Sequence, residues 1–279
     1  MEYVKLNNGI KMPVFGIGTY LLTPEQAEKS VSTALNCGYR LIDTANFYAN
    51  EKAVGRAMKN SGIPRDEIFL ETKIWPTHYK DENAIDKTLE RLGTDYIDML
   101  LVHQPTGDYI NAYGMLEKAY REGKVRAIGL SNFNKEEMCR MMNICSVKPT
   151  LLQTEIHPYY SEQDLKKFLL LQDIHIQAWY PLGHGDGKLL NEPIFAKLAK
   201  KYGKTAVQII LRWHVQQCNI VIPGSKSPEH IKENIDIFDF ELSDEEMLAI
   251  ASLDNGERYY IRSPERFARY LKTVIPFEE

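Results

Sequence analysis

The sequence has few cysteines, no long apolar run and no block of like charge, and each shortage excludes a class of protein. Four cysteines without C-x-x-C spacing cannot staple a chain of 279 residues, so reduced and buried thiols are expected. No stretch of about 18 apolar residues occurs, which argues against a membrane span. The first residues lack the apolar segment of a secretory signal, so a cytoplasmic location is expected.

The charged residues give no sign of a polyanionic partner. The net charge is −4, and lysines and arginines are scattered, so we expect neither nucleic acid nor a membrane surface to bind. The seven histidines include no HxxxH or HxH pair, which argues against a metal site. A small molecule is therefore the expected partner, and a barrel of this size is expected to be stable as a monomer.

What is present is the composition of an ordinary globular protein and a strong periodicity. Apolar residues make up 44% of the chain, enough for a sizeable core. Eight short runs are apolar in succession rather than alternating, which is typical of parallel strands buried on both faces. The runs cover residues 14–20, 39–43, 68–73, 96–102, 124–130, 150–156, 174–180 and 219–224.

Segments with helical periodicity separate these runs. The segment 23–38 begins with a threonine cap and a proline and stops at a glycine, and similar patterns occupy 81–93, 110–123 and 134–145. Eight successive βα units predict one domain over residues 1–279, folded as a (β/α)8 barrel. Periodicity does not reveal closure, so an open doubly wound sheet remains the alternative.

Two segments lie outside the repeated units. Residues 3–12 have apolar ends around Asn-Asn-Gly and predict a β-hairpin that could close the bottom of the barrel. Residues 252–279 form a tail rich in Tyr, Phe, Arg and Pro that could lie across the top, where the active site of such a barrel is found.

Polar or ionisable residues stand at nearly every predicted strand end, where side chains of (β/α)8 barrels do their chemistry. They are Asp43, Lys73, His103, Ser131, Asn132, Gln153, Glu155, Tyr180, Ser225 and Lys226. Taken singly, each fits an ordinary role, such as a helix cap for Asp43 or a solvated charge for Lys73. Taken together, an acid, an ammonium and an imidazole at one cleft form a proton-transfer set.

The stretch GYRLIDTANFYANEKAVG, residues 38–55, resembles the signature of the aldo-keto reductase family. The similarity continues through ETKIWP at 71–76, LLVHQP at 100–105, IGLSNF at 128–133, QTEIHP at 153–158 and AWYPLG at 178–183. The resemblance spans essentially the whole chain. It implies hydride transfer from C4 of a nicotinamide to an aldehyde or ketone.

The resemblance selects Tyr48, one of 16 tyrosines, as the general acid. Its phenol has an ordinary pKa of about 10, which Lys73 is expected to lower. Asp43 would hold Lys73, and His103 would orient the substrate carbonyl. Tyr48, Trp75 and His103 are the implied substrate contacts.

The resemblance also implies the cofactor contacts. Ser131, Asn132 and Gln153 match residues that bind the nicotinamide carboxamide, and Tyr180 matches the aromatic ring stacked on it. The loop 181–190 resembles the segment that folds over the pyrophosphate. The other implied contacts are Gly18, Thr19, Tyr20, Asp43, Pro181, Leu182, Gly183, Glu233 and Asn234.

The segment 222–234 departs from the family pattern at the site of the adenosine 2′-phosphate. Gly224 and His230 stand where many members carry Lys and Arg. Ser225, Lys226 and Ser227 could still bind a phosphate at the start of a helix. NADP(H) is therefore the expected cofactor, with NAD(H) possible.

Two other functions stay open. A member of the family could bind the cofactor without turnover and act as a regulatory or structural protein. A barrel isomerase or lyase of phosphorylated sugars would not need the nicotinamide set. For a reductase, the short segment 106–113 predicts an open pocket for small aldehydes, α-dicarbonyls or keto sugars.

Overall fold

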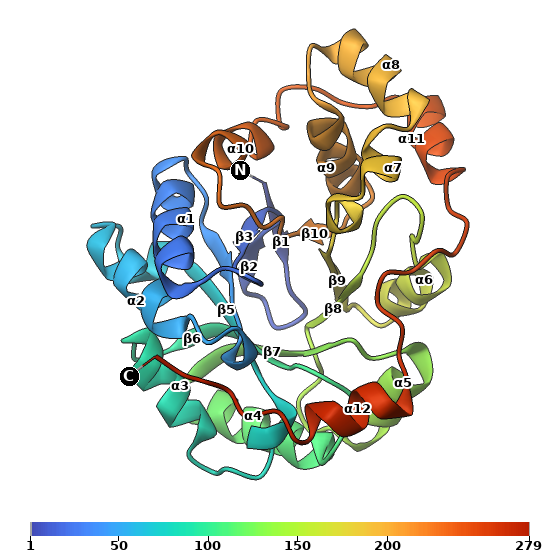
Figure 1. Ribbon diagram of the computed structural model, residues 1–279. Helices are drawn as coiled ribbons and strands as arrows, with labels where there is room; N and C mark the ends of the chain where they lie inside the picture. Colours follow the sequence, from blue (N-terminus) through green and yellow to red (C-terminus); the bar gives the residue numbers. More distant parts are fainter. Residues whose placement is uncertain (1, 279) are drawn as a thin grey trace.

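The computed structural model describes residues 2–278, and its centre is a barrel of eight parallel strands ringed by helices (Figure 1). The strands pair in chain order: β3 (Gly16–Gly18), β4 (Leu41–Asp43), β5 (Phe69–Ile74), β6 (Ile97–Val102), β7 (Val125–Ser131), β8 (Leu151–Glu155), β9 (His175–Trp179) and β10 (Ile220–Val221). Parallel bridges from Phe15 to Val221 and from Gly18 to Gly224 join the two ends of the sheet. The predicted (β/α)8 barrel is confirmed, and the open sheet is wrong because the first and last strands meet.

The helices follow the strands and cover the outside of the barrel. They are α1 (Pro24–Asn36), α2 (Glu51–Asn60), α3 (Ala84–Leu92), α4 (Tyr109–Arg121), α5 (Lys135–Ile144), α6 (Gln163–Leu171), α7 (Gly187–Leu190), α8 (Pro193–Tyr202), α9 (Ala206–Gln216), α10 (Pro228–Asn234), α11 (Asp244–Ala251) and α12 (Pro264–Tyr270). Capping boxes at Thr23, Asn134, Thr205 and Ser243 satisfy the first backbone N–H groups of α1, α5, α9 and α11. Local sequence therefore sets where these helices begin.

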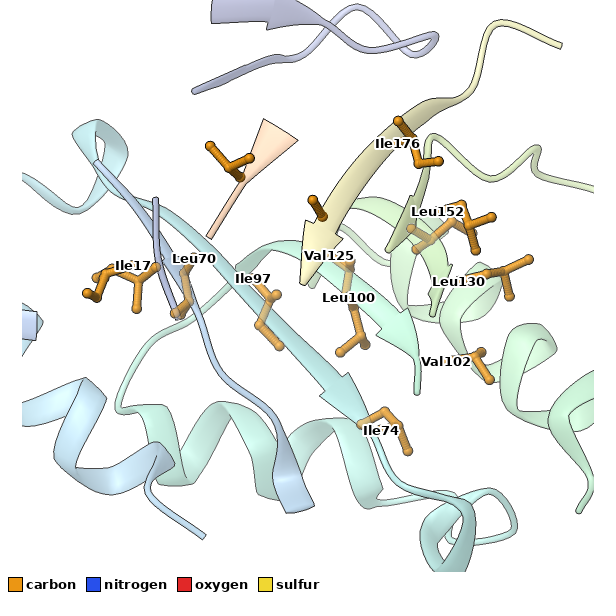
Figure 2. Packing of buried hydrophobic residues seen from close by; sticks show 14 of the residues in the cluster. Ile17, Leu70, Ile74, Ile97, Leu100, Val102, Val125, Leu130, Leu152 and Ile176 are labelled. Carbon is orange, nitrogen blue, oxygen red and sulfur yellow. The ribbon is translucent and has the colours of Figure 1, made fainter. Parts of the chain in front are cut away.

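The strands are apolar in succession because both of their faces are buried. In β6, Met99 and Leu101 belong to the cluster inside the barrel, whereas Leu100 and Val102 belong to the layer under the helices. Figure 2 shows the outer layer, in which side chains of successive strands such as Leu130 and Leu152 lie side by side. This burial explains why the strand pattern shows no polar alternation.

The N-terminal hairpin closes the bottom of the barrel, as the sequence predicts. β1 (Tyr3–Lys5) pairs antiparallel with β2 (Lys11–Pro13). In the turn, Asn7 Nδ2 donates to the carbonyl oxygens of Pro149 and Asp173, at 2.9 and 3.0 Å. Pro149 lies just before β8 and Asp173 just before β9, so the hairpin is bound to the amino ends of these two strands.

The C-terminal tail lies across the opposite end. The carboxylate of Glu155, the last residue of β8, accepts from the backbone N–H groups of Tyr259 (2.6 Å) and Tyr260 (3.0 Å). Beyond α12, the chain continues to α2, where Arg56 contacts Glu278 at 3.0 Å. In Figure 1 the dark red segment beyond α12 runs along the rim past α4 to the C-terminus beside α3. The expectation of a tail over the top is confirmed.

Among residues 2–278, none of the helices combines the length and apolar character that crossing a membrane requires. All four cysteines are unpaired, but the expectation that they are buried is wrong. Cys37, Cys139 and Cys145 are partly exposed and Cys218 is exposed. The reason is their position: Cys37 and Cys145 cap the ends of α1 and α5 at the surface.

The crossing of α2 and α3 depends on one glycine. A methyl group on Gly55 would lie 2.3 Å from the backbone oxygen of Leu92, so the two helices would have to move apart. We expect Gly55→Ala to lower the free energy of unfolding by about 1–3 kcal/mol, measured by urea denaturation.

Gly114, an exposed glycine of α4, is the matched control because a methyl group there would meet no atom within 4 Å. Gly114→Ala is expected to leave stability unchanged or raise it slightly, since alanine has the higher helix propensity. Equal effects of the two substitutions would contradict the close approach at Gly55.

Candidate active site

A cavity of about 440 Å³ opens at the carboxyl ends of the strands. Its lining combines strand-end residues such as Asp43 and His103, the loop that follows β9, and the C-terminal tail. The volume is in the range of small-molecule sites. The fold thus gathers residues more than 200 positions apart in the sequence around one space.

A buried ammonium group forms the base of the cavity. Lys73, in β5, is fully buried and forms an ion pair with Asp43 at the end of the neighbouring strand β4. Its Nζ also donates to the backbone oxygen of Thr44 at 2.9 Å and to the hydroxyl of Tyr48 at 3.2 Å. The geometry therefore brings together three of the four residues expected to act in proton transfer, Asp43, Tyr48 and Lys73.

The phenol of Tyr48 is held in its protonated form. Burial raises the pKa of Tyr48 well above its usual range, and the charge of Asp43 and the neighbouring Tyr20 raise it further. The lowering expected from Lys73 does not appear in the net shift, because burial and the charge of Asp43 outweigh the ammonium. At neutral pH the phenol keeps the proton that a general acid must donate.

His103 is a neutral histidine beside the phenol. Burial, and then the charge of Lys73, lower the pKa of His103 well below its usual range. Its ring centroid lies 5.8 Å from that of Tyr48 and 4.9 Å from the nearest ring centroid of Trp75. A neutral imidazole has one N–H to offer to an oxygen atom in the cavity.

An aromatic wall stands next to these polar groups. Trp75 lines the cavity, as expected, and its ring stacks on Phe47 with centroids 4.0 Å apart. Tyr270, from α12, packs edge-on against Trp75 at 4.8 Å. Phe47 and Tyr270 also line the cavity, and sequence reasoning missed both. The only signal for Tyr270 was the aromatic composition of the tail.

Gln153 is fixed from inside the barrel. Its Nε2 has three acceptors: Asp43 Oδ1 at 2.9 Å, Glu71 Oε1 at 2.7 Å and Gln177 Oε1 at 2.7 Å. The amide nitrogen has two N–H groups, and the carboxylate of Asp43 can only accept, so the nitrogen end of the amide points inward. Within residues 2–278, the Oε1 atom of Gln153 accepts no hydrogen bond, and the residue lines the cavity. The amide is therefore oriented with a free acceptor.

Glu71 is a buried carboxyl group that sequence reasoning missed. It lies in β5 two residues before Lys73, and the only signal was an acidic residue in an otherwise apolar run. Burial, and then the charge of Asp43, raise the pKa of Glu71 well above its usual range, and Lys73 offsets this only in part. We expect Glu71 to be protonated at neutral pH.

The protonated state of Glu71 predicts a pH dependence of stability. In the unfolded chain its carboxyl ionises near pH 4.3, about the ordinary glutamate value, whereas in the folded protein it stays neutral to higher pH. Its contribution to stability is therefore complete below about pH 4 and is lost as pH rises toward the folded pKa. Glu71→Gln should become more stable relative to the parent as pH rises from about 4 toward the folded pKa of Glu71, measured by urea denaturation. A difference that does not change with pH would contradict a protonated Glu71.

Several residues expected at the cofactor also line the cavity: Gly18, Tyr20, Asp43, Asn132, Gln153, Tyr180, Pro181, Leu182 and Ser225. Other expected residues do not line it. The Thr19 hydroxyl donates to the backbone oxygen of Asp43 at 3.0 Å, and Ser131 Oγ accepts from Asn132 Nδ2 at 3.1 Å. These hydroxyls bind the protein itself. Also outside the lining are Gly183, Lys226, Ser227, His230, Glu233 and Asn234.

The expected phosphate segment contains an acidic residue that the sequence analysis did not consider. Ser227 caps α10: its Oγ accepts from the backbone N–H of His230 at 3.3 Å and donates to the carboxylate of Glu229 at 2.7 Å. The hydrogen bond from Ser227 lowers the pKa of Glu229, which is therefore ionised. Lys226 and His230 are both exposed. The negative charge of Glu229 thus lies in the segment that was expected to bind the 2′-phosphate of the cofactor.

The loop after β9 is tied to the C-terminal tail. The hydroxyl of Tyr259 donates to Asp186 at 2.6 Å, and Lys188 pairs with Glu257 at 3.1 Å. Tyr180 packs on His184 of this loop, with ring centroids 4.4 Å apart. The loop and the tail together form one side of the cavity.

Within residues 2–278, no group of three His, Cys, Asp or Glu is placed to hold a metal ion.

Comparisons with known proteins agree with this geometry. The profile of the Aldo/keto reductase family matches residues 14–255. A glyoxal reductase of Bacillus subtilis is 41% identical, over 92% of this chain and 94% of that protein. A morphine 6-dehydrogenase of Pseudomonas putida is 39% identical, over 91% of this chain and 92% of that protein.

Solved structures show the same similarity. The crystal structure of MGS-M4, an aldo-keto reductase from a deep-sea metagenome library, superimposes with a TM-score of 0.89 at 40% identity, covering 93% of this chain and 97% of that one. An aldo/keto reductase from Brucella melitensis gives a TM-score of 0.87 at 42% identity, covering 91% and 99%.

Proposed function

We propose that this chain, which belongs to the aldo/keto reductase family, uses a nicotinamide cofactor to reduce small aldehydes and ketones to alcohols. One observation carries the proposal: a protonated phenol, Tyr48, lies at the cavity within 3.2 Å of a buried, paired ammonium, Lys73. That arrangement suits a proton donor whose conjugate base is stabilised.

The cavity has features that fit a nicotinamide ring. The Oε1 atom of Gln153 is an oriented acceptor for a carboxamide N–H₂, and Tyr180 offers an aromatic surface in the same cavity. Leu182 and Ser225 line the side toward α10, where the rest of a dinucleotide would lie. When bound, the cofactor would supply the hydride for the carbonyl carbon.

The residues of the chain would then move one proton. Tyr48 would donate its hydroxyl proton to the carbonyl oxygen as the carbon accepts hydride. Lys73, held by Asp43, would stabilise the resulting phenolate. His103 would donate its single N–H to the same oxygen and orient the carbonyl. The wall formed by Phe47 and Trp75 would exclude water from these groups.

Replacing the phenol tests this assignment directly. We expect Tyr48→Phe to lower kcat by about a hundredfold to ten-thousandfold, because only the proton donor is removed. Cofactor affinity, followed by quenching of tryptophan fluorescence, should be retained. Tyr109→Phe is the matched control, since the Tyr109 hydroxyl contacts Arg140 outside the cavity.

The alternative is a member that binds the cofactor without turnover. Asp43, Tyr48, Lys73 and His103 are all present and lie around one cavity, which favours an enzyme. Tight cofactor binding with no NADPH or NADH oxidation across a panel of aldehydes and ketones would favour the alternative.

We propose NADP(H) as the preferred cofactor, with Lys226 as the cation for the 2′-phosphate. Glu229 would weaken that preference because its charge lies beside the expected phosphate. Glu229→Gln should raise the ratio of NADPH to NADH affinity by about twofold to fivefold, and Lys226→Ala should lower it similarly, as for exposed charge pairs.

Fluorescence titration measures both affinities, and Lys232→Ala provides a control because Lys232 is an exposed cation of the same helix. Equal ratios in the parent and both variants would place the 2′-phosphate elsewhere. The cytoplasmic location, the monomeric state and the single-domain organisation stay predictions.

A further inference from the structure

The cavity has one charged side chain whose role in the proposed reaction is not accounted for. Its lining contains Asp43, which is paired with Lys73, and Arg266, from α12. No other Asp, Glu, Lys or Arg among the described residues lines it. With the Asp43 charge offset, the guanidinium of Arg266 leaves the cavity with an unbalanced positive charge.

Arg266 has no anionic partner of its own within residues 2–278. No carboxylate lies within 4.0 Å of its guanidinium, and that group makes no hydrogen bond to a described residue. It packs over the ring of Tyr260, 4.9 Å from the centroid. Arg262, four residues earlier in the same tail, is paired with Glu137. The five N–H donors of Arg266 are thus available to a ligand.

The ring of Tyr260, over which the guanidinium of Arg266 packs, is fixed by hydrogen bonds. The Tyr260 hydroxyl donates to Gln104 Oε1 at 3.0 Å, and its backbone N–H donates to Glu155 at 3.0 Å. The backbone N–H of Arg266 donates to Ser263 Oγ, the cap of α12, at 3.1 Å. A guanidinium placed on such a support loses less freedom when it binds an anion.

The charge of Arg266 acts on the phenols of the cavity. Burial raises the pKa of Tyr20 and of Tyr180, and Arg266 opposes that rise at both. These tyrosines come from the ends of β3 and β9, so the positive field extends from the tail toward the barrel side. An anion held by Arg266 would therefore lie within the cavity.

We propose that Arg266 is a specificity-determining residue that binds the carboxylate of the substrate. The preferred substrates are then aldehydes and ketones that carry a carboxylate. Arginine suits this role because its planar fork binds a carboxylate through two parallel hydrogen bonds. The aromatic wall of Phe47, Trp75 and Tyr270 would hold the carbon skeleton. The proposal rests on the proposed carbonyl reduction.

The test compares two aldehydes of similar size and reactivity, 4-carboxybenzaldehyde and neutral 4-nitrobenzaldehyde. In Arg266→Gln, the ratio of kcat/KM for the first to that for the second should fall about tenfold to a hundredfold, through KM. The ratio for Arg266→Lys should lie between the ratios for the parent and for Arg266→Gln, because lysine keeps the positive charge but lacks the planar fork of the guanidinium. Arg269→Gln, an exposed arginine of the same helix outside the cavity, should keep the parent ratio.

Benzoate gives a readout that needs no turnover of the probe. It should inhibit competitively against the aldehyde, with an inhibition constant about tenfold or more higher in Arg266→Gln. Circular dichroism and the Arg266→Lys variant separate this effect from misfolding.

Two results would overturn the proposal, and a third would remove the proposed function on which it rests. One is an unchanged ratio in Arg266→Gln. Another is weaker cofactor binding with an unchanged ratio, which would assign Arg266 to a phosphate of the dinucleotide. Absence of turnover by the parent with every aldehyde would instead remove the proposed function itself.

Discussion

The buried ammonium of Lys73 constrains the whole catalytic end of the barrel. An ammonium removed from water is costly unless it is paired and hydrogen-bonded, and Asp43, Thr44 and Tyr48 supply those partners. All three follow from strand β4 and the turn after it. The set exists only while β4 and β5 stay neighbours in register, with Asp43 opposite Glu71.

This constraint also sets the protonation of the surrounding groups. Burial, and then the charge of Asp43, raise the pKa values of both Glu71 and Tyr48, and the single cation of this space does not reverse either shift. His103 responds in the opposite direction and stays neutral. The neutral groups around a single ion pair are those that a proton donor and a hydrogen-bond donor require.

The barrel and the tail contribute different properties to the cavity. The strand ends carry the polar groups, whose positions are set by the barrel itself. The tail adds Tyr260, Arg266 and Tyr270, and it is fastened by Glu155 at the end of β8. In the proposed function, chemistry and selectivity are thus located on different segments, as expected for a fold whose loops vary around a constant scaffold.

Much of the fold was predictable because its signals are local. Buried strands, caps such as Thr23 and polar strand ends are written within a few residues of one another. Position at a strand end predicted Asp43, Lys73 and His103, but Tyr48 needed the family resemblance. Alternation along the chain turned Thr19 toward the protein instead of the cavity, whereas Ser131 is fully buried and hydrogen-bonded to Asn132.

By itself, the sequence determined the eight βα units and the polar residues at the strand ends, because periodicity and capping act between near neighbours, whereas closure of the barrel needed the long-range bridges between its first and last strands. The tertiary structure alone decided which distant residues complete the site. Arg266 reaches the cavity only through the docking of the tail. The direction of the Tyr48 pKa also depends on burial and on Asp43, both products of long-range packing. The pKa of a group depends on its burial and on all charges near it in the folded site, and a local sequence pattern contains neither.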